Sequence, residues 1–361
     1  MTYPDGHDGW LATGYAACRA VLADRRFSSR YELMRLPVPI AGAPPELPPA
    51  PVGDLTGIDA PEHTRLRPLL VGCFTVRRMR ALTRRVEEIT ADRLDAMERA
   101  GAPVDLVAEF ASPIRALVIC ELFGVPYGDR DAFRRHVATL TDMGTAAEEK
   151  GAAVEALQAY LLDLVRAARG RPGDDVLGSL TTGDLTDDEL AGTGAFLLGA
   201  GLDTTANMLA LGTLALQRHP DQLAALRSEP GIVESSVEEL LRYLTIAHTN
   251  VRAALEDVEV DGQLIRAGES VTIAMQAANR DPARYPDPEV LDLRRRAAGH
   301  LALGHGIHQC LGQQPARVEM RVAFPALFAR FPALRLDCAP ADVPLRTSST
   351  IYGVHRLPVA W

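Results

Sequence analysis

The chain has no stretch that could cross a membrane and no excess of basic residues. No apolar run approaches the roughly 18 residues that a transmembrane helix needs, and the first residues lack the charged-then-apolar pattern of a secretory signal. The formal net charge is -9, whereas proteins that bind nucleic acid in general carry a basic surface. We therefore expect a cytoplasmic protein with no membrane anchor and no nucleic-acid partner.

Cysteine is sparse as well. The five cysteines are scattered and odd in number, which argues against a disulfide framework. Four of them are expected to behave as small buried apolar residues. The remaining one, Cys310, differs because glycines and histidines surround it in the sequence.

Most of the sequence has helical periodicity. Apolar residues recur at helical spacing over Val76–Ala100 and Ala152–Gly170, and the valine and isoleucine content of Asp257–Met275 indicates short strands separated by turns. We find no fixed-period repeat and no linker. The sequence therefore predicts one domain over residues 1–361, mainly α with small β-sheets.

One predicted helix is unusual. It begins after a Thr186–Glu189 capping box, ends before Pro220 and is apolar on almost every side, so it should cross the interior. Its middle nevertheless contains Asp203 and Thr204, and charge inside a buried helix is costly unless it has a partner or a function. On the residues alone two interpretations stay open: a functional polar site, or glycines that allow close packing with hydroxyls bonded back to the helix.

The segment LALGHGIHQCLGQQPAR (Leu301–Arg317) predicts a ligand site at Cys310. Glycines allow the backbone to approach a flat ligand, and a cysteine at the start of a helix is expected to have a lowered pKa. Thiolate is the form that binds iron. Two alternatives stay open: a buried structural cysteine, and a zinc site of His305, His308 and Cys310, for which the sequence offers no further cluster of cysteine and histidine. The spacing favours haem over zinc.

Five motifs, in order, resemble those of the cytochrome P-450 family. LALGHGIHQCLG is similar to the haem-binding loop of that family, and AGLDTT (Ala200–Thr205) to its oxygen-activating helix. The other three are DAPEHTRLR (Asp59–Arg67), EELLR (Glu238–Arg242) and ANRDPARYPDP (Ala278–Pro288). The resemblance extends from about Trp10 to Trp361 and implies the cytochrome P-450 fold.

The sequence departs from the family pattern at two places. Leu303 stands where the loop of the family opens with an aromatic residue, which is expected to loosen the surroundings of the thiolate. The chain also begins almost at the strand that HDGWLATGY resembles, so we expect an N-terminally shortened version of the fold.

The resemblance assigns cofactor-binding and structural roles by position. It implies haem b, with Cys310 as the axial ligand of the iron. The residues expected to bind the haem propionates are His63, Arg67, Arg252 and His308. Three further residues, Glu239, Arg242 and Arg295, are expected to form a structural ion-pair group rather than a catalytic one, with Glu238 as an alternative partner of Arg242 by spacing.

Other positions are implied to act on oxygen and substrate. Asp203 and Thr204 resemble the acid–alcohol pair that relays protons to bound oxygen. The tentative substrate contacts are Ala200, Ala247, His248, Ser349 and Thr350. The proline-rich segment Leu36–Gly53 is expected to cover the pocket as a lid.

The resemblance implies a monooxygenase that inserts one atom of dioxygen into a small organic substrate, in natural-product metabolism. Because the sequence has no flavin or iron–sulfur region, electrons are expected from NAD(P)H through a ferredoxin reductase and a ferredoxin, docked near Arg294 and Arg296 by complementary charge. Oxidative aromatic coupling or desaturation at the same haem is one alternative. A haem-binding sensor without turnover is another, although a sensor needs no proton relay.

Overall fold

The computed structural model describes residues 1–361 apart from 4–5, 7, 38–45, 142–145 and 348, and apart from the side chains at 134, 137–138, 140–141, 147 and 150. The α-helices in this part of the chain are α1 (Tyr15–Ala23), α2 (Glu62–Val71), α3 (Val76–Ala100), α4 (Ser112–Phe123), α5 (Arg130–Thr141), α6 (Ala147–Gly170), α7 (Val176–Leu180), α8 (Asp187–Arg218), α9 (Pro220–Ser228), α10 (Val233–Leu244), α11 (Met275–Ala278) and α12 (Gln313–Arg330). A π-helix, η2 (Val107–Ala111), precedes α4, and short 3-10 turns are η1 (Tyr31–Leu33), η3 (Tyr127–Asp129), η4 (Pro230–Ile232), η5 (Gly306–His308) and η6 (Pro340–Asp342).

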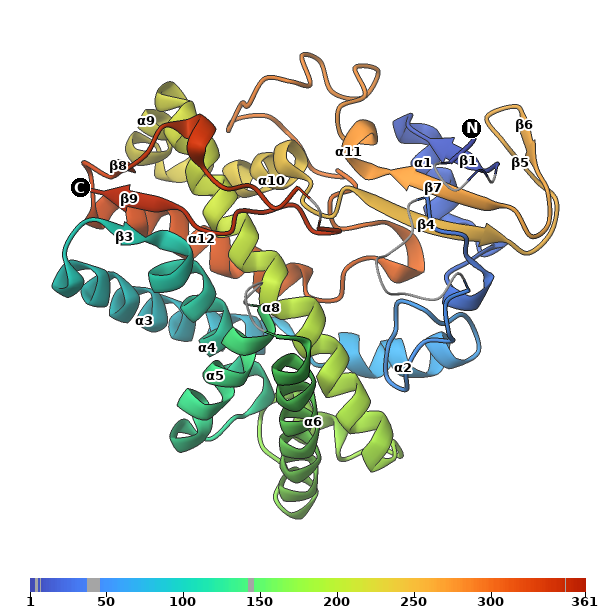
Figure 1. Ribbon diagram of the computed structural model, residues 1–361, viewed down its shortest axis with the longest axis horizontal. Coiled ribbons are helices and arrows are strands. Elements are labelled where there is room, and N and C mark those ends of the chain that lie inside the picture. The colour runs from blue at the N-terminus through green and yellow to red at the C-terminus, as the bar shows by residue number, and fades with distance from the viewer. Residues whose placement is uncertain (4–5, 7, 38–45, 142–145, 348) are drawn as a thin grey trace.

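The strands form small sheets at two ends of the molecule (Figure 1). One sheet has the order β1-β7-β4-β2 and comprises β1 (Trp10–Ala12), β2 (Phe27–Ser28), β4 (Thr249–Ala254) and β7 (Ser270–Ala274). A second has the order β3-β9-β8 and comprises β3 (Val104–Asp105), β8 (Arg335–Leu336) and β9 (Pro358–Ala360). A hairpin joins β5 (Val258–Val260) to β6 (Gln263–Ile265). The strands predicted within Asp257–Met275 are therefore confirmed as β5, β6 and β7.

Helix α8 runs through the middle of the molecule, between helices α3 to α6 and the β1-β7-β4-β2 sheet (Figure 1). Its start is the predicted capping box: Thr186 Oγ1 accepts from the Glu189 backbone N–H at 3.2 Å, and Glu189 Oε2 accepts from the Thr186 N–H at 3.0 Å. Most of its second half is buried, as its apolar composition predicts. No helix within the described ranges is long and apolar enough to span a membrane.

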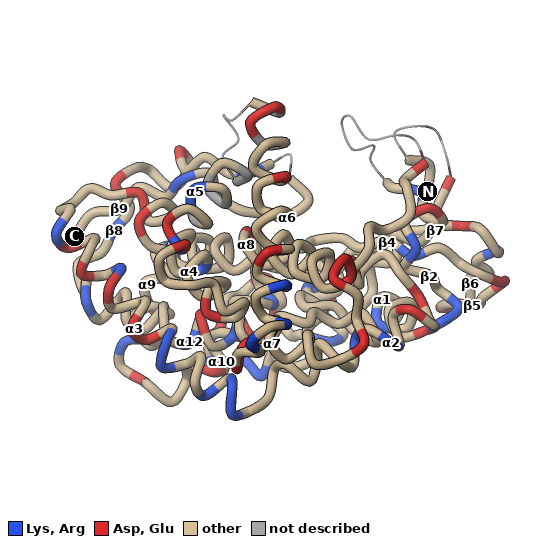
Figure 2. Tube along the Cα trace, turned by 90° about the horizontal axis from the view of Figure 1, so that it is seen from below, with Lys and Arg blue, Asp and Glu red and all other residues tan. Residues whose placement is uncertain are grey.

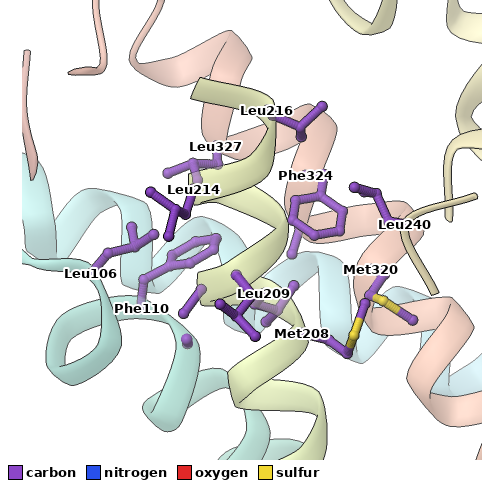
Figure 3. Close-up of a cluster of buried hydrophobic side chains, with 14 of the residues drawn as sticks. Leu106, Phe110, Met208, Leu209, Leu214, Leu216, Leu240, Met320, Phe324 and Leu327 are labelled. Carbon is purple, nitrogen blue, oxygen red and sulfur yellow. The ribbon is translucent and has the colours of Figure 1, made fainter. Parts of the chain in front are cut away.

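The largest core cluster forms where α8 crosses α12 and η2. Leu209 of α8 and Leu327 and Phe324 of α12 pack with Phe110 of η2 (Figure 3), all at most 2% exposed. Burying one side chain of this kind stabilises a fold by about 1.5–3 kcal/mol. This packing fixes α12, which follows the Cys310 loop, against α8. It therefore holds the Cys310 loop in a fixed position relative to the part of α8 that contains Asp203 and Thr204.

Candidate active site

A cavity of about 300 Å³ lies between α8 and the segment Ala302–Gly312. Helices α4 and α12 complete its walls, and most of its lining is apolar, for example Ile119, Phe196 and Leu311. The polar groups are few, which is typical of a pocket that binds a largely apolar ligand and orients it with a small number of polar contacts.

The Cys310 loop closes the cavity on the side of α12. The Cys310 N–H donates to the Leu303 carbonyl oxygen at 2.8 Å, so the departure at Leu303 stands directly across the loop. Gly304 and Gly306 have φ of 71° and 75°, and a Cβ at Gly306 would lie 2.3 Å from the Leu22 carbonyl oxygen. The loop therefore needs glycine at position 306 both for its backbone conformation and for its approach to α1.

The predicted lowering of the Cys310 pKa is wrong for the protein alone. Cys310 is exposed only to the cavity it faces, and the surrounding protein desolvates the thiol, so burial raises its pKa. The backbone of Gly312 and the charges of Arg115 and Arg67 act in the opposite direction. Helix α12 begins only at Gln313, and its amino end does not outweigh desolvation. Thiolate at this position is thus expected with a bound cation rather than without one.

Four basic side chains from three segments lie near one another at the cavity. The rings of His63, on α2, and His308 have their centroids 4.2 Å apart. Arg67, one turn after His63, donates to the Gln309 carbonyl oxygen. Arg252 of β4 is 5% exposed and donates to Asn250 Oδ1 at 2.5 Å. The resemblance to the family predicted these four residues as one group, and the structure places them near one another.

The four residues have an unmet need for negative charge. His63 Nε2 and both ring nitrogens of His308 are buried without a hydrogen-bond partner, and within the described residues no carboxylate forms an ion pair with any of the four. Desolvation, assisted by neighbouring cations, lowers the pKa of His308 to about 3, and desolvation lowers that of Arg252 to about 10. Such a group is suited to an anionic ligand, because an anion would supply the missing acceptors.

In the middle of α8, Thr204 and Asp203 face different surroundings. Thr204 lines the cavity, and its hydroxyl donates to the Ala200 carbonyl oxygen at 3.1 Å. Asp203 is not among the lining residues described; its carboxylate accepts from Arg346 Nη1 at 2.6 and 2.7 Å. Arg346 belongs to the terminal hairpin, which we define by the antiparallel Leu345–Val354 bridge. Sequence analysis missed Arg346 because it lies 143 residues from Asp203 and in no recognised motif.

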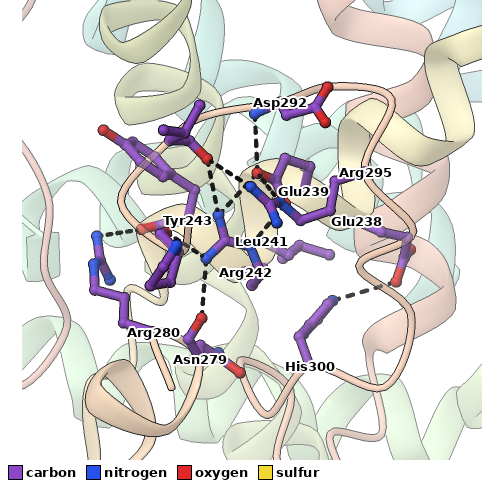
Figure 4. A network of polar contacts seen from close by, with 12 residues as sticks. Glu238, Glu239, Leu241, Arg242, Tyr243, Asn279, Arg280, Asp292, Arg295 and His300 are labelled. Atoms are coloured by element: carbon purple, nitrogen blue, oxygen red, sulfur yellow. Dashed lines mark hydrogen bonds and ion pairs between the residues drawn. The ribbon is translucent and has the colours of Figure 1, made fainter. Parts of the chain in front are cut away.

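The predicted structural group of Glu239, Arg242 and Arg295 is assembled and almost fully enclosed (Figure 4). Arg242 Nε donates to Glu239 Oε2 at 2.7 Å, and Arg295 Nε donates to Glu239 Oε1 at 3.2 Å. Arg242 also donates to the carbonyl oxygens of Asn279 and Pro288, each at 2.9 Å. Glu238 does not take the place of Glu239: it pairs with Arg317 and lies near His300.

The tentative substrate contacts divide into two groups. Ala200 and Ala247 line the cavity. His248, Ser349 and Thr350 do not line it within the described structure, so direct contact is not supported for them. The Ser349 hydroxyl instead accepts from Arg346 Nη2 at 3.4 Å and from the Ile351 N–H at 3.3 Å. Of the predicted lid Leu36–Gly53, residues 38–45 lie outside the described residues.

The zinc alternative finds no support. Among the described residues, no three histidine, cysteine, aspartate or glutamate side chains form a group that could hold a metal ion. Cys310, Arg67 and His308 instead line one largely apolar cavity. His63 packs against His308, and Arg252 is close enough to His308 to lower its pKa. Together these residues define a site for a largely apolar group that carries negative charge at one edge. The same group would need an atom that the sulfur of Cys310 can bind.

The chain belongs to the cytochrome P450 family. The family model described as Cytochrome P450 matches residues 161–350. The chain is 49% identical to Cytochrome P450 105C1 of a Streptomyces species, over 99% of this chain and 91% of that protein. It is 45% identical to pentalenic acid synthase of Streptomyces avermitilis, over 99% of this chain and 89% of that protein. A crystal structure of a mutant of CYP105P1 aligns with TM-score 0.94 and 42% identity, covering 100% of this chain and 92% of that one. The predicted family and fold are therefore confirmed, and the chain is an oxidoreductase of the monooxygenase type.

The haem that this family holds through thiolate fits the residues present. Two propionate groups would supply the acceptors that His63 Nε2 and the His308 ring lack. Arg67 and Arg252 would supply positive charge for the same two carboxylates. The apolar walls suit a porphyrin face, and Cys310 faces the cavity opposite Thr204-bearing α8.

Proposed function

We propose that this chain is a haem-thiolate monooxygenase of natural-product metabolism, in which Cys310 would hold the iron of haem b. One observation carries the proposal: Cys310, Arg67 and His308 line an apolar cavity, where His63 Nε2 and both His308 ring nitrogens are buried without a hydrogen-bond partner among the described residues. Relatives named pentalenic acid synthase and nocardicin C N-oxygenase support a role in secondary metabolism.

The chain's own residues would bind and orient the haem. Cys310 would supply the sulfur ligand, while His63, Arg67, Arg252 and His308 would hold the two propionates. When bound, the haem supplies dioxygen binding and reductive O–O bond cleavage, which a thiolate ligand favours. The walls of the cavity exclude water from the reacting centre.

Thr204 and Asp203 would deliver protons on the side of the cavity formed by α8. The Thr204 hydroxyl lies at the cavity, where it can donate a hydrogen bond to a ligand in exchange for the Ala200 carbonyl oxygen. Asp203 is 30% exposed at its side chain and held by Arg346, so its carboxylate can exchange protons with solvent one residue away from Thr204. A carboxylate and a hydroxyl in adjacent positions are suited to general acid catalysis.

The lining suggests a largely apolar small substrate. Oxygen insertion is our first assignment, and oxidative aromatic coupling or desaturation by the same site is the second. Turnover separates both from a haem-binding sensor, which would bind haem but form no product with NAD(P)H and redox partners.

Electrons are proposed to come from a ferredoxin and its reductase. Basic and acidic residues are interspersed around α10 and α12 (Figure 2). Arg294 is held by Glu229, whereas Arg296 is exposed and forms no hydrogen bond or ion pair with a described residue. Arg296 is thus the freer of the two predicted docking residues.

Cys310→Ser tests the proposal directly. The parent protein, reduced and exposed to carbon monoxide, should show the long-wavelength Soret band of thiolate ligation. The variant should lose that band, because a serine hydroxyl is a poor substitute for thiolate. Cys338→Ser, a change at another cysteine that is not fully buried, is the matched control and should keep it. A band that survives in Cys310→Ser would exclude Cys310 as the ligand.

A further inference from the structure

A buried arginine on α4 is not explained by the haem-binding residues. Arg115 is 6% exposed and lines the cavity together with Cys310 and Thr204. Its Nη1 donates to Glu319 Oε1, on α12, at 2.5 Å, and its Nε donates to the Gly201 carbonyl oxygen, on α8, at 2.6 Å. One guanidinium therefore joins three helices around the cavity.

Helix α8 is shaped to accept this arginine. A Cβ at Gly201 would lie 2.4 Å from Arg115 Nη2 and 3.2 Å from Ile119 Cδ1. Any side chain at position 201 would therefore push the guanidinium out of its place. Gly201 stands three residues before Thr204, so Arg115 is held beside the segment of α8 that faces the distal side of the cavity.

The partner of Arg115 is incompletely paired. Glu319 is 0% exposed, and its Oε2 has no hydrogen-bond partner among the described residues. Burial raises the pKa of Glu319 to about 7 although Arg115 opposes the shift. A buried ion pair is often no more stabilising than apolar side chains of similar volume. Stability alone is thus a weak reason for this pair to line the cavity.

The position of the pair relative to Cys310 gives a stronger reason. Arg115 and Cys310 line the same cavity, and the guanidinium of Arg115 is held there by Glu319 and by the Gly201 carbonyl oxygen. Arg67 is expected to be neutralised by a propionate. Arg317 is paired with Glu238. A cation in a site of low dielectric acts strongly on nearby charge.

We propose that Arg115 is a positioning residue that fixes a positive charge beside the thiolate and thereby raises the midpoint potential for one-electron reduction at the site. The negative charge of Glu319 partly offsets this effect. The inference rests on the proposed function, since it requires a haem bound by Cys310. Reduction adds one electron from the ferredoxin and so one negative charge, which a fixed cation stabilises.

The test is a redox titration of the haem-loaded protein at pH 8, where Glu319 is ionised in the parent. Arg115→Gln should lower the midpoint potential, and Glu319→Gln should raise it, because Arg115 then keeps an uncompensated charge. We expect each equilibrium constant of reduction to change on the order of tenfold, which is about 59 mV for a one-electron couple. Arg321→Gln removes a charge from α12 at a partly exposed ion pair and should leave the potential unchanged.

Opposite signs are the decisive result. A purely structural role would make both variants disturb the same hydrogen bond and shift the potential in the same direction. Shifts of the same sign, or none beyond that of Arg321→Gln, would overturn the proposal. If Arg115→Gln binds no haem, Glu319→Gln against Arg321→Gln decides alone: an upward shift supports the role and no shift overturns it. If the parent protein itself shows no long-wavelength band with carbon monoxide, the proposed function is contradicted instead.

Discussion

Two glutamates in this protein are fully enclosed in ion pairs, but they differ in how completely their oxygens are paired. Glu239 accepts through Oε2 from Arg242 and through Oε1 from Arg242, Arg295 and the Asp292 N–H. Glu319 accepts from Arg115 through one oxygen only. The Glu239 group lies among the segments before the Cys310 loop (Figure 4), whereas the Arg115–Glu319 pair borders the cavity.

The difference separates a structural network from an electrostatic one. A network in which each donor and acceptor is satisfied fixes one conformation of the chain around it, and Arg242 fixes the carbonyl oxygens of residues 279, 288 and 290. A pair with a spare oxygen is less rigid and can change its charge. Stability should therefore depend mainly on the first pair, and the properties of the site on the second.

The largest effect is expected from Arg242→Met. The change leaves Glu239 buried with too few donors, which costs about 3–5 kcal/mol when one partner of a buried pair is removed. Urea unfolding of the purified protein should show the loss, together with poor haem incorporation. Arg295→Met is the matched control and should cost less, because the Arg295 side chain is 13% exposed and Arg242 still holds Glu239. Equal stability of Arg242→Met and the parent would remove the contrast between the two glutamates.

The second effect concerns pH. The folded-state pKa of Glu319 is raised from 4.5 to about 7, so the folded state binds more protons between these values and loses stability as pH rises through that window. Relative to Glu319→Gln, the parent should lose about 3 kcal/mol between pH 4.5 and 7, measured as the difference in urea midpoints.

Glu238→Gln sharpens the same measurement, because the sign is opposite. The pKa of Glu238 is lowered from 4.5 to about 2: hydrogen bonds from His300 and Arg317 outweigh desolvation, the largest single influence. Its stabilisation is present above pH 4.5 and disappears as the pH falls toward 2. Parallel pH curves for the parent and Glu319→Gln would show that Glu319 keeps an ordinary pKa.

A third ion pair, between Arg346 and Asp203, is partly exposed. It should affect the yield of product per NAD(P)H more than the stability of the fold. Arg346→Gln releases Asp203, whose side chain is 30% exposed, so the free energy of unfolding should change by about 1 kcal/mol or less. Without Arg346 the carboxylate loses its fixed orientation, and we expect less product per NAD(P)H and more peroxide. Arg335→Gln, at an exposed residue of β8, should leave this ratio unchanged. If Arg346→Gln forms as much product per NAD(P)H as the parent does, the orientation of Asp203 by Arg346 is not needed for proton delivery.

The smallest effect on stability is expected at the surface. Arg294 and Glu229 have side chains 49% and 43% exposed, so Arg294→Gln should change the free energy of unfolding by no more than about 0.5 kcal/mol. Arg296→Gln should change it equally little yet slow reduction by ferredoxin more than Arg294→Gln does, since no glutamate competes for it. Stopped-flow reduction at several salt concentrations measures this. Identical rates for both variants and the parent would place the docking face elsewhere.

The sequence predicted what local pattern or motif determines. The extent of α3, the capping box of α8 and the strands within Asp257–Met275 were correct, because periodicity and capping chemistry act over a few residues. Spacing allowed either Glu238 or Glu239 as the partner of Arg242, and the resemblance to the family selected Glu239, which the structure shows.

Contacts between distant segments were out of reach of the same reasoning. Arg115 and Glu319 are separated by 204 residues, and Arg346 and Asp203 by 143, so nothing in local spacing joins them. The pKa of Cys310 was predicted in the wrong direction for a related reason. Local sequence shows a nearby helix end, but desolvation depends on every segment that closes the cavity.

The terminal hairpin is attached to α8 at two places one helical turn apart. Arg346 holds Asp203, and Gly353 approaches Asn207 so closely that a Cβ there would lie 1.9 Å from Asn207 Oδ1. Ser349 and Thr350 lie between these attachments and outside the cavity lining described. The two attachments fix the orientation of Asp203, and Ser349 is linked to it through Arg346, whose bond to the Ser349 hydroxyl is long at 3.4 Å. Substitutions at Ser349 and Thr350, with Arg346 and Gly353 kept, should therefore leave the position of the Asp203 carboxylate almost unchanged.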